Sequence, residues 1–117
     1  MQTSELARRA QLTTRQVRHY EREGLIGGRR DENGHRDYPP ETASVARRIG
    51  HLVDLGFTTG EIRTFIDRIS PPAAGAASPK ELLHRRERLA RIDATIETLR
   101  ATRAELMELL VSDVLDA

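Results

Sequence analysis

One short segment of the chain concentrates side chains that bind anions, at the spacing of a helix face. Arg15, Arg18 and Arg22 follow Thr14 at intervals near three and four residues, so a helix would carry all four on one broad face. Guanidinium groups form bidentate hydrogen bonds with phosphates and with guanine edges in the major groove. The pattern therefore indicates nucleic-acid binding, with Thr14 and Arg15, near the start of the helix, as candidates for base edges.

These arginines have an alternative role. They could form helical ion pairs with Glu21 and Glu23, or simply meet solvent. A polar stretch just downstream adds cations that would share the same surface: Arg29, Arg30, His35 and Arg36. This second cluster favours DNA binding over a merely solvated helix.

Residue types that carry catalysis or hold metals are sparse. The chain has no Cys, which excludes thiolate metal sites and cysteine nucleophiles. There is neither an HExxH zinc pattern nor a Gly-rich phosphate loop. The four His are scattered, and none has another His, or an acid with a clear ligand role, three or four residues further on: His19, His35, His51 and His84. We therefore expect no enzyme, no cofactor and no metal site.

Length and composition suit one small domain with an extension. The chain has 117 residues, of which 38% are hydrophobic and 32% charged, so a single large core is not expected. The first residues lack the apolar stretch of a signal peptide, and no run approaches the roughly 18 apolar residues of a membrane helix. We expect a cytoplasmic protein with no membrane partner.

A helix-turn-helix would position the arginine face. Thr3 or Ser4 can cap a first helix. After a short break, Thr14 or its close rival Thr13 can cap a second helix, which Gly24 ends as a C′ residue. Two short helices joined by a turn of about three residues form this motif.

A hairpin is predicted over residues 29–38. Asn33-Gly34 suits a tight turn because both residues tolerate positive φ. The arms are short and polar, so they must lean on the helices to be stable. A helix-turn-helix followed by a basic hairpin is a winged helix.

Two further helices complete the expected domain. The first begins near Pro40 or Glu41 and ends at Gly56, and the second is capped by Thr58 or Thr59. Their apolar residues, with two from the preceding helix, recur at helical spacing and form the expected core: Val17, Tyr20, Val45, Ile49, Leu52, Val53, Ile62, Phe65, Ile66 and Ile69.

A long helix is predicted over residues 79–111. An uncharged Pro/Gly/Ala-rich linker, residues 70–78, separates it from the first domain, residues 1–69. Its seam positions alternate by three and four, as in a coiled coil, with Arg85 and Arg103 interrupting the apolar series. The apolar seam residues are Leu82, Leu89, Ile92, Ile96, Leu99, Leu106 and Leu110. So narrow and long a stripe favours homodimerisation over packing against its own domain, and residues 112–117 form a short tail.

Several short motifs resemble, in order and spacing, the MerR family of transcriptional regulators. They are Glu5-Leu6-Ala7, the VRHYEREGLI run from Val17, the NGHRDY run from Asn33, Leu55-Gly56-Phe57-Thr58, and Glu61-Ile62. Each motif is weak alone, and jointly they are highly specific. The resemblance covers residues 1–69, and the coiled-coil helix extends it to nearly the whole chain.

The resemblance implies a mainly α fold, in which a winged helix-turn-helix DNA-binding domain precedes a helix that dimerises as an antiparallel coiled coil. The implied partners are a second copy of the chain, an inverted repeat in double-stranded promoter DNA, and RNA polymerase. The resemblance also implies a bacterial protein that is associated with the nucleoid when bound. The dimer would bend and untwist a promoter whose elements lie too far apart. Arg18 and Tyr20 would contact DNA from the recognition helix, and Arg36 and Tyr38 would contact backbone phosphates from the wing.

Three departures from the family pattern stand out. Where the family often has two tyrosines, this chain has His19-Tyr20, and His19 could still bond a phosphate. The family's metal and redox sensors use Cys, so sensing by those means is ruled out here. Its drug sensors carry a large effector domain, whereas this chain resembles a short form without one. No residue identifies an inducer, the operator, the regulated genes or the sign of regulation.

Two other functions remain open at the level of sequence. An architectural or recombination accessory protein of the excisionase type would bind several tandem sites without a transcriptional response. A protein-interaction module working through residues 79–111 would show no salt-dependent DNA binding.

Overall fold

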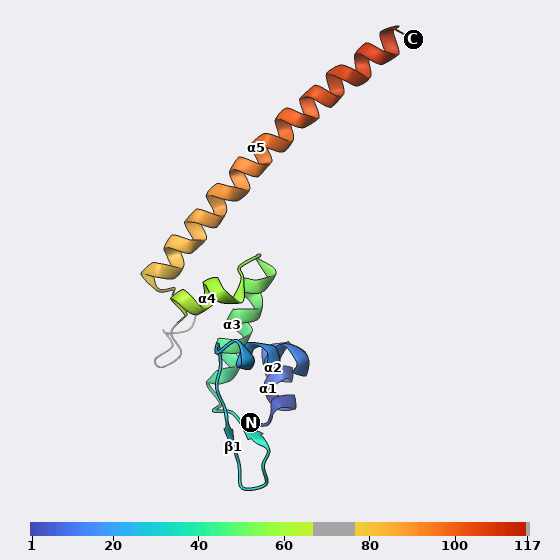
Figure 1. The fold of residues 1–117 in the computed structure, drawn as a ribbon. Coiled ribbons are helices and arrows are strands. Elements are labelled where there is room, and N and C mark those ends of the chain that lie inside the picture. The colour runs from blue at the N-terminus through green and yellow to red at the C-terminus, as the bar shows by residue number, and fades with distance from the viewer. Residues whose placement is uncertain (67–76, 117) are drawn as a thin grey trace. The chain divides into compact units, whose positions relative to one another are not determined.

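A computed structural model of the protein describes residues 1–66 and 77–116. The chain divides into two units, Met1–Glu81 and Leu82–Ala117 (Figure 1). The predicted domain end at residue 69, the predicted core residue Ile69, most of the predicted linker 70–78 and the last residue of the predicted tail lie outside the described residues. Those boundaries therefore stay predictions.

Helix α1 (Thr3–Ala10) opens the first unit. The prediction that Thr3 or Ser4 caps it is wrong. Gln2 stands at the N-cap in extended conformation and makes no side-chain capping bond, and its carbonyl accepts the N–H of Leu6 at 3.0 Å. Because the backbone is already helical at Thr3, both predicted caps lie inside the first turn.

Helix α2 (Thr14–Arg22) completes the predicted helix-turn-helix. Of the two cap candidates, the structure selects Thr13. Its hydroxyl accepts the N–H of Gln16 at 3.1 Å, and the Gln16 side chain accepts the Thr13 N–H at 2.8 Å, which forms a capping box. Gly24 follows the helix with φ 75°, as predicted for a C′ residue.

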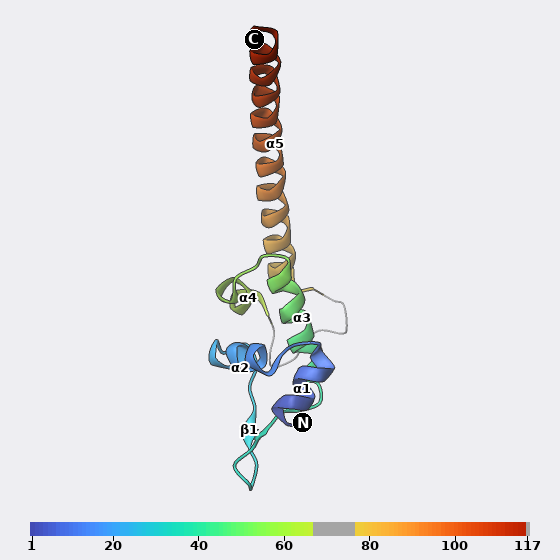
Figure 2. The same ribbon diagram turned by 90° about the vertical axis from the view of Figure 1, so that its right-hand side faces the viewer.

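The predicted wing is present as a short antiparallel hairpin. Strand β1 (Arg29–Arg30) pairs with β2 (Arg36–Asp37), with Arg30 opposite Arg36. The hairpin extends away from the helices of its unit in both views (Figures 1 and 2). With strands of two residues each, it depends on the contacts at its base for stability.

The tip of the wing differs from the predicted two-residue turn. Five residues, 31–35, separate the strands, and of the expected pair only Gly34 has positive φ, at 80°. The Asp31 carboxylate organises the loop by accepting the backbone N–H groups of Asn33 and His35, each at 2.9 Å. Two backbone bonds close the same loop, from the Asp31 N–H to the His35 carbonyl at 2.7 Å and from the Gly34 N–H to the Asp31 carbonyl at 3.0 Å. The Asp31 side chain therefore reinforces a longer turn than the predicted one.

Two helices follow the wing, as predicted. Helix α3 (Thr42–Asp54) is followed by Gly56 at φ 95°, and α4 (Thr59–Phe65) comes directly after it. Thr58 caps α4 through a second capping box, in which its hydroxyl accepts the Glu61 N–H at 3.1 Å. Both elements confirm predictions made from local sequence signals.

The core of this unit lies where α1 packs against α2 and α3. The predicted core residues that the structure describes are buried, or half-buried against the core. The rings of Phe57 and Phe65 meet edge to face, with centroids 5.8 Å apart. The fully buried set combines all the helices of the unit with the segments beside the wing: Leu6, Ala7, Ala10, Val17, Tyr20, Leu25, Ile26, Tyr38, Ala46, Ile49, Leu52, Phe57, Ile62 and Phe65.

The last helix, α5 (Pro79–Asp116), begins within the first unit. The Ser78 hydroxyl accepts the Glu81 N–H at 3.1 Å, as a cap. The Glu81 side chain is buried and forms an ion pair with Arg48 of α3. The Ser78 hydroxyl also donates to the Phe65 carbonyl at 3.2 Å. This hydrogen bond and the ion pair attach the start of α5 to α4 and α3.

The second unit is the rest of α5, and it is a single helix. It continues past the predicted end at Val111 to Asp116, so the predicted tail is helical over 112–116. That stretch contains neither Gly nor Pro, so nothing in it ends the helix. No described residue from Leu82 onward is buried.

Candidate nucleic-acid interface

The outer face of α2 is cationic and open to solvent. Arg15, Arg18, His19 and Arg22 are exposed, and Thr14 is half-buried at the start of the helix. The inner face carries the buried Val17 and Tyr20. This division matches the predicted recognition helix.

The two acids of α2 are each bound by an arginine from another element. Glu21 forms an ion pair with Arg36 of the wing, and Glu23 pairs with Arg63 of α4 at 2.8 Å. Arg63 also donates to the Glu23 carbonyl at 2.8 Å. The acids that could have neutralised the recognition arginines are therefore occupied elsewhere.

The recognition arginines keep their charges available as a result. Across residues 1–66 and 77–116, no ion pair joins Arg15, Arg18 or Arg22 to another residue. This overturns the alternative in which they pair with Glu21 and Glu23. Three exposed guanidinium groups on one helix face form a surface suited to phosphates and base edges.

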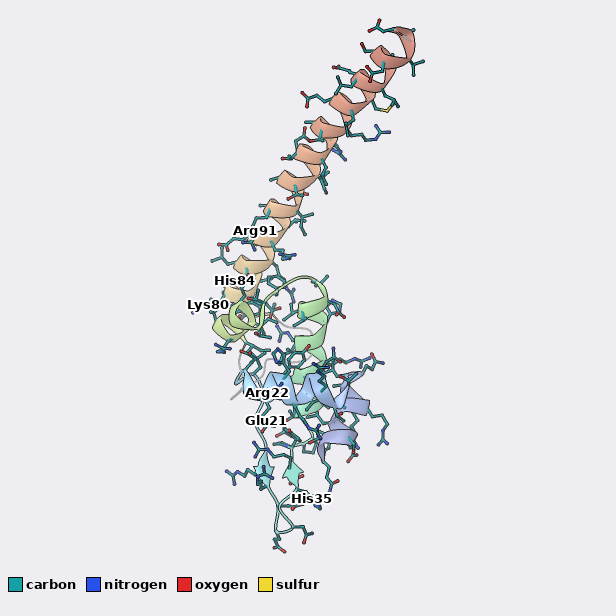
Figure 3. All side chains as sticks on the ribbon, turned by 45° about the vertical axis from the view of Figure 1, so that its right-hand side comes forward. Glu21, Arg22, His35, Lys80, His84 and Arg91 are labelled. Carbon is teal, nitrogen blue, oxygen red and sulfur yellow. The ribbon has the colours of Figure 1, made fainter. Side chains whose placement is uncertain are left out.

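Glu21 joins the recognition helix to the wing. One carboxylate oxygen is paired with Arg36, and the other accepts the Tyr38 hydroxyl at 2.6 Å. Arg36 also donates to the Gly28 carbonyl at 3.3 Å. Figure 3 shows Glu21 on the side of α2 towards the wing, beside the solvent-facing Arg22. We call Glu21, Gly28, Arg36 and Tyr38 the Glu21 clamp.

The Tyr38 ring fits closely within the clamp. A Cβ atom on Gly28 would lie 2.8 Å from the ring and 3.0 Å from the Asp37 carbonyl, so only glycine leaves room for it. Burial raises the pKa of Tyr38 above its usual value, and the hydrogen bond to Glu21 raises that pKa further. The phenol is therefore held as a protonated donor.

The two predicted DNA-binding tyrosines lie in the core. Tyr20 is 3% exposed and Tyr38 is 1% exposed. Burial, followed by the charge of Asp54, raises the pKa of Tyr20. The centroids of the Tyr20 and His19 rings are 5.9 Å apart. The DNA contacts of both tyrosines, like those of Arg15, Arg18 and His19, remain predictions. The side chains of the latter three are exposed, as such contacts require.

The wing adds cations beside this surface. Arg29 and Arg30 are exposed, and Arg30 donates to the Gly34 carbonyl at 2.8 Å across the loop. His35 lies near the tip of the wing (Figure 3). Arg36, unlike these three, is half-buried in the Glu21 clamp. Arg29, Arg30 and His35 therefore present more exposed cationic groups than Arg36 does.

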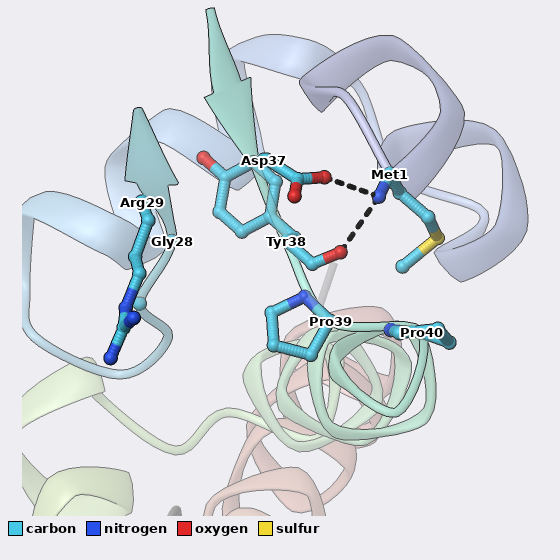
Figure 4. A pocket seen from close by; sticks show the side chains of 8 residues that line it. Met1, Gly28, Arg29, Asp37, Tyr38, Pro39 and Pro40 are labelled. Carbon is cyan, nitrogen blue, oxygen red and sulfur yellow. Dashed lines mark hydrogen bonds and ion pairs between the residues drawn. The ribbon is translucent and has the colours of Figure 1, made fainter. Parts of the chain in front are cut away.

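A hollow lies at the base of the wing (Figure 4). The Met1 ammonium group donates to the Asp37 carboxylate at 2.8 Å and to the Tyr38 carbonyl at 2.7 Å. In the other direction, the Tyr38 N–H donates to the Met1 carbonyl at 2.7 Å. These bonds fix the strand that carries Arg36 and Tyr38 from the side opposite α2.

Some residues of this site escaped sequence reasoning. Glu21, Gly28 and Arg63 were not predicted to have site roles. The ion pair between Arg48 of α3 and Glu81 of α5 was not predicted either. Glu21 and Glu23 were the one usable signal for these residues. Acids beside a cationic helix face must pair with arginines of that face or with arginines elsewhere, and the sequence did not show which. Their partners are 15 and 40 positions away in the chain, beyond any local pattern.

Metal-binding clusters and membrane-spanning helices are both absent from the part of the chain that the structure describes. Among residues 1–66 and 77–116, no group of three or more His, Asp or Glu side chains is placed to hold a metal ion. None of the helices in that part of the chain is both long and apolar enough to span a membrane.

The predicted dimerisation residues lie along α5 with their side chains exposed: Leu82, Leu89, Ile92, Ile96, Leu99, Leu106 and Leu110. Their exposed fractions range from 41% to 63%. A helix of 38 residues is about 57 Å long, so this apolar stripe is extensive. Unpartnered apolar area of this kind marks an interaction surface.

Comparisons with known proteins agree with this architecture. A family model described as MerR HTH family regulatory protein matches residues 1–69, and one described as MerR, DNA binding matches residues 46–109. The HTH-type transcriptional regulator CueR of Salmonella typhimurium is 27% identical over 113 residues, which cover 96% of this chain and 80% of CueR.

Two more relatives extend the comparison. Nodulation protein NolA of Bradyrhizobium diazoefficiens is 32% identical over 108 residues, 92% of this chain, and the chain spans only 42% of NolA's length. The crystal structure of the transcription regulator PbrR691 from Ralstonia metallidurans CH34, in complex with lead(II), superposes with a TM-score of 0.61 at 25% identity. The match covers 93% of this chain and 84% of that one. The chain belongs to the MerR family of helix-turn-helix transcriptional regulators.

Proposed function

We propose that this DNA-binding regulator acts as a homodimer on an inverted-repeat promoter operator and controls transcription by distorting the DNA. The observation that carries the proposal is the pairing of Glu21 and Glu23 with Arg36 and Arg63. It leaves the arginines of α2 as an uncompensated cationic face. A helix with such a face suits the major groove, and the basic wing suits the adjacent backbone.

Within this interface we assign different roles to the two elements. Thr14 and Arg15 read base edges from the start of α2, while Arg18 and His19 bind phosphates. Arg36 binds a backbone phosphate through the part of its side chain that Glu21 leaves open, since 37% of it is exposed. The burial of Tyr20 and Tyr38 favours a supporting role for both, with at most the hydroxyl edge reaching DNA.

A pair of variants tests this division. Arg15→Ala should relax base preference at one position of each half-site, at a cost of roughly 1–3 kcal/mol. Arg36→Ala should weaken binding to all sequences and reduce the salt slope by about one for each phosphate that is no longer neutralised. The measurement is the dissociation constant at several salt concentrations, on a duplex selected from a random pool and on random DNA. Equal losses on both duplexes for both variants would refute the assignment.

The dimer is proposed to form through α5 in antiparallel orientation. The exposed apolar stripe of α5 supplies the contact between the two helices. The distribution of charge along α5 supports the antiparallel orientation. Residues 80–91 hold five Lys or Arg and two acids, whereas residues 92–116 hold two Arg and six acids. An antiparallel pair places each basic half beside an acidic half, and a parallel pair places like charges together.

Single cysteines can report the orientation, because the chain has no Cys of its own. In an antiparallel pair centred on the stripe, two Ile96→Cys side chains meet and form a disulfide. Two Leu110→Cys side chains lie about 42 Å apart along the axis, far beyond the roughly 7 Å between Cα atoms that a disulfide allows. Mixing Leu82→Cys with Leu110→Cys should cross-link them to each other. Efficient Leu110→Cys homodimers would indicate a parallel pair.

The mechanism is proposed from the geometry of such a dimer. Two winged domains held at a distance contact two half-sites and leave the centre of the operator free to be strained, at a cost of order 1–6 kcal/mol. The operator would lie in an over-long promoter spacer that RNA polymerase cannot use undistorted.

A reporter assay tests this mechanism. Deleting two or so central base pairs should make transcription independent of the protein and turn the bound protein into a repressor. A native spacer of ordinary length, with repression by the bound protein, would favour simple occlusion.

A further inference from the structure

We propose that Glu21 is a positioning residue that locks the wing to the recognition helix, so that both contact a half-site as one rigid unit. The inference rests on the proposed DNA-binding function and adds a residue that does not itself touch DNA. It explains why Glu21, an acid that by itself would weaken DNA binding, lies next to a cationic surface.

The first argument is geometric. Arg36 lies in β2 and Tyr38 is the second residue after it in the chain. Their side chains meet the two oxygens of one carboxylate. The Glu21 side chain is 16% exposed, so solvent competes little for these bonds. Two bonds to one carboxylate fix both the distance and the rotation of β2 relative to α2.

The second argument concerns what else could hold the wing. Within residues 1–66 the structure has no other side-chain hydrogen bond between α2 and the hairpin. Strands of two residues each are not stable alone. Three hydrogen bonds with Met1 hold the base of the wing independently of α2. Without Glu21, no side-chain hydrogen bond among residues 1–66 would join the wing to α2.

The third argument is electrostatic. An acid near bound DNA lowers affinity for every sequence, because the phosphates repel it. Glu21 lies beside the wing in an ion pair with Arg36, so its repulsion of phosphates lowers affinity for any DNA. On the correct operator, the alignment of the wing with α2 that Glu21 maintains can offset this loss of affinity. The clamp should therefore matter more for specific than for non-specific binding.

The test compares Glu21→Gln with Glu23→Gln in the full chain. Both variants remove one negative charge from α2, but only Glu21 contacts the wing. Dissociation constants are measured on a duplex that the wild-type protein selects from a random pool and on random DNA, well below the melting temperature. Glu21→Gln should lower the ratio of specific to non-specific affinity by roughly tenfold, and Glu23→Gln should leave the ratio unchanged.

Tyr38→Phe provides a second variant that keeps the buried ring and removes only the hydroxyl. It should shift the affinity ratio in the same direction by a smaller factor. If Glu21→Gln tightens binding to both duplexes as much as Glu23→Gln does, Glu21 merely repels DNA and the proposal is wrong. A loss of affinity that scales with the fraction unfolded would also overturn it, because that is the mark of a purely structural residue.

A readout without DNA separates this inference from the proposed function. In a Tyr20→Phe background, Tyr38 is the one remaining tyrosine, and tyrosinate absorbance reports its titration. Because Glu21 raises the pKa of Tyr38, Glu21→Gln should lower that pKa and speed hydrogen exchange in the wing. No change in either would overturn the clamp even if the protein binds DNA. A wild-type protein that binds no DNA would refute the proposed function and, with it, the clamp's role in binding.

Discussion

The two units of this chain treat their apolar residues in opposite ways. In the first unit, Leu6 and Ile49 are fully buried, and the polar groups beside them find partners within the same unit. In the second, Leu99 and Leu110 are 62% and 63% exposed. The first unit is closed by its own core, whereas the apolar stripe of α5 is exposed, and we propose that a second copy of the chain covers it. In the proposed dimer, each chain forms its own DNA-binding surface, and the distance between the two surfaces depends on α5.

The largest expected effect breaks the α5 contact. Ile96→Asp with Leu99→Asp removes four apolar side chains from the dimer, and each is worth roughly 1.5–3 kcal/mol. The dimer dissociation constant, measured by sedimentation, should rise by about four orders of magnitude or more. Ala94→Asp with Thr98→Asp adds the same charges on the opposite helix face and should leave the dimer intact. If the wild-type protein is a monomer at micromolar concentration, the proposal that the α5 stripe forms a homodimer is wrong.

A core substitution should affect only the first unit. Ile49→Ala leaves a cavity where α1 packs on α3 and should destabilise this unit by roughly 2–5 kcal/mol. Cross-linking through Ile96→Cys should persist, because α5 contributes little to that core. Urea unfolding followed by circular dichroism, beside the cross-linking assay, checks both expectations. Simultaneous loss of both signals would mean that the two units are not energetically separate.

A smaller effect is expected at the base of the wing. Gly28→Ala places a methyl group 2.8 Å from the Tyr38 ring, and such overpacking should cost roughly 1–3 kcal/mol. Gly27→Ala is the matched control, since nothing lies within 4 Å of its Cβ position. Thermal melting of the two variants measures the difference. Equal melting temperatures would show that the clamp tolerates displacement of the ring.

The smallest effects concern the helix caps. Thr13→Ala should cost about 1 kcal/mol by removing the acceptor at the start of α2. Ser78→Ala should cost a similar amount at the start of α5. Ser4→Ala, inside the first turn of α1, should be nearly neutral. A Ser4 effect as large as that of Thr13 would contradict the assignment of Gln2 as the α1 cap.

Much of the fold could be predicted because its signals are local. The stop at Gly24, the cap at Thr58 and the order of helices each depend on a few neighbouring residues. The misplaced α1 cap and the wing turn show the limit of such signals. Several residues near Thr3 and Asn33 could have served, and contacts between neighbouring backbone and side-chain groups selected among them.

The sequence alone determined the family, the arginine face of α2 and the heptad spacing of α5, because periodicity places residues on a helix face without reference to the rest of the chain. Only the tertiary structure decided what happens to the charges on α2. Glu21 could have paired with a neighbouring arginine one turn away, and instead it meets Arg36 and Tyr38, 15 and 17 residues further on. The reason is physical. An exposed helical pair gains only a few tenths of a kcal/mol, whereas a half-buried carboxylate gains more from two fixed donors brought to it by the packing of the wing.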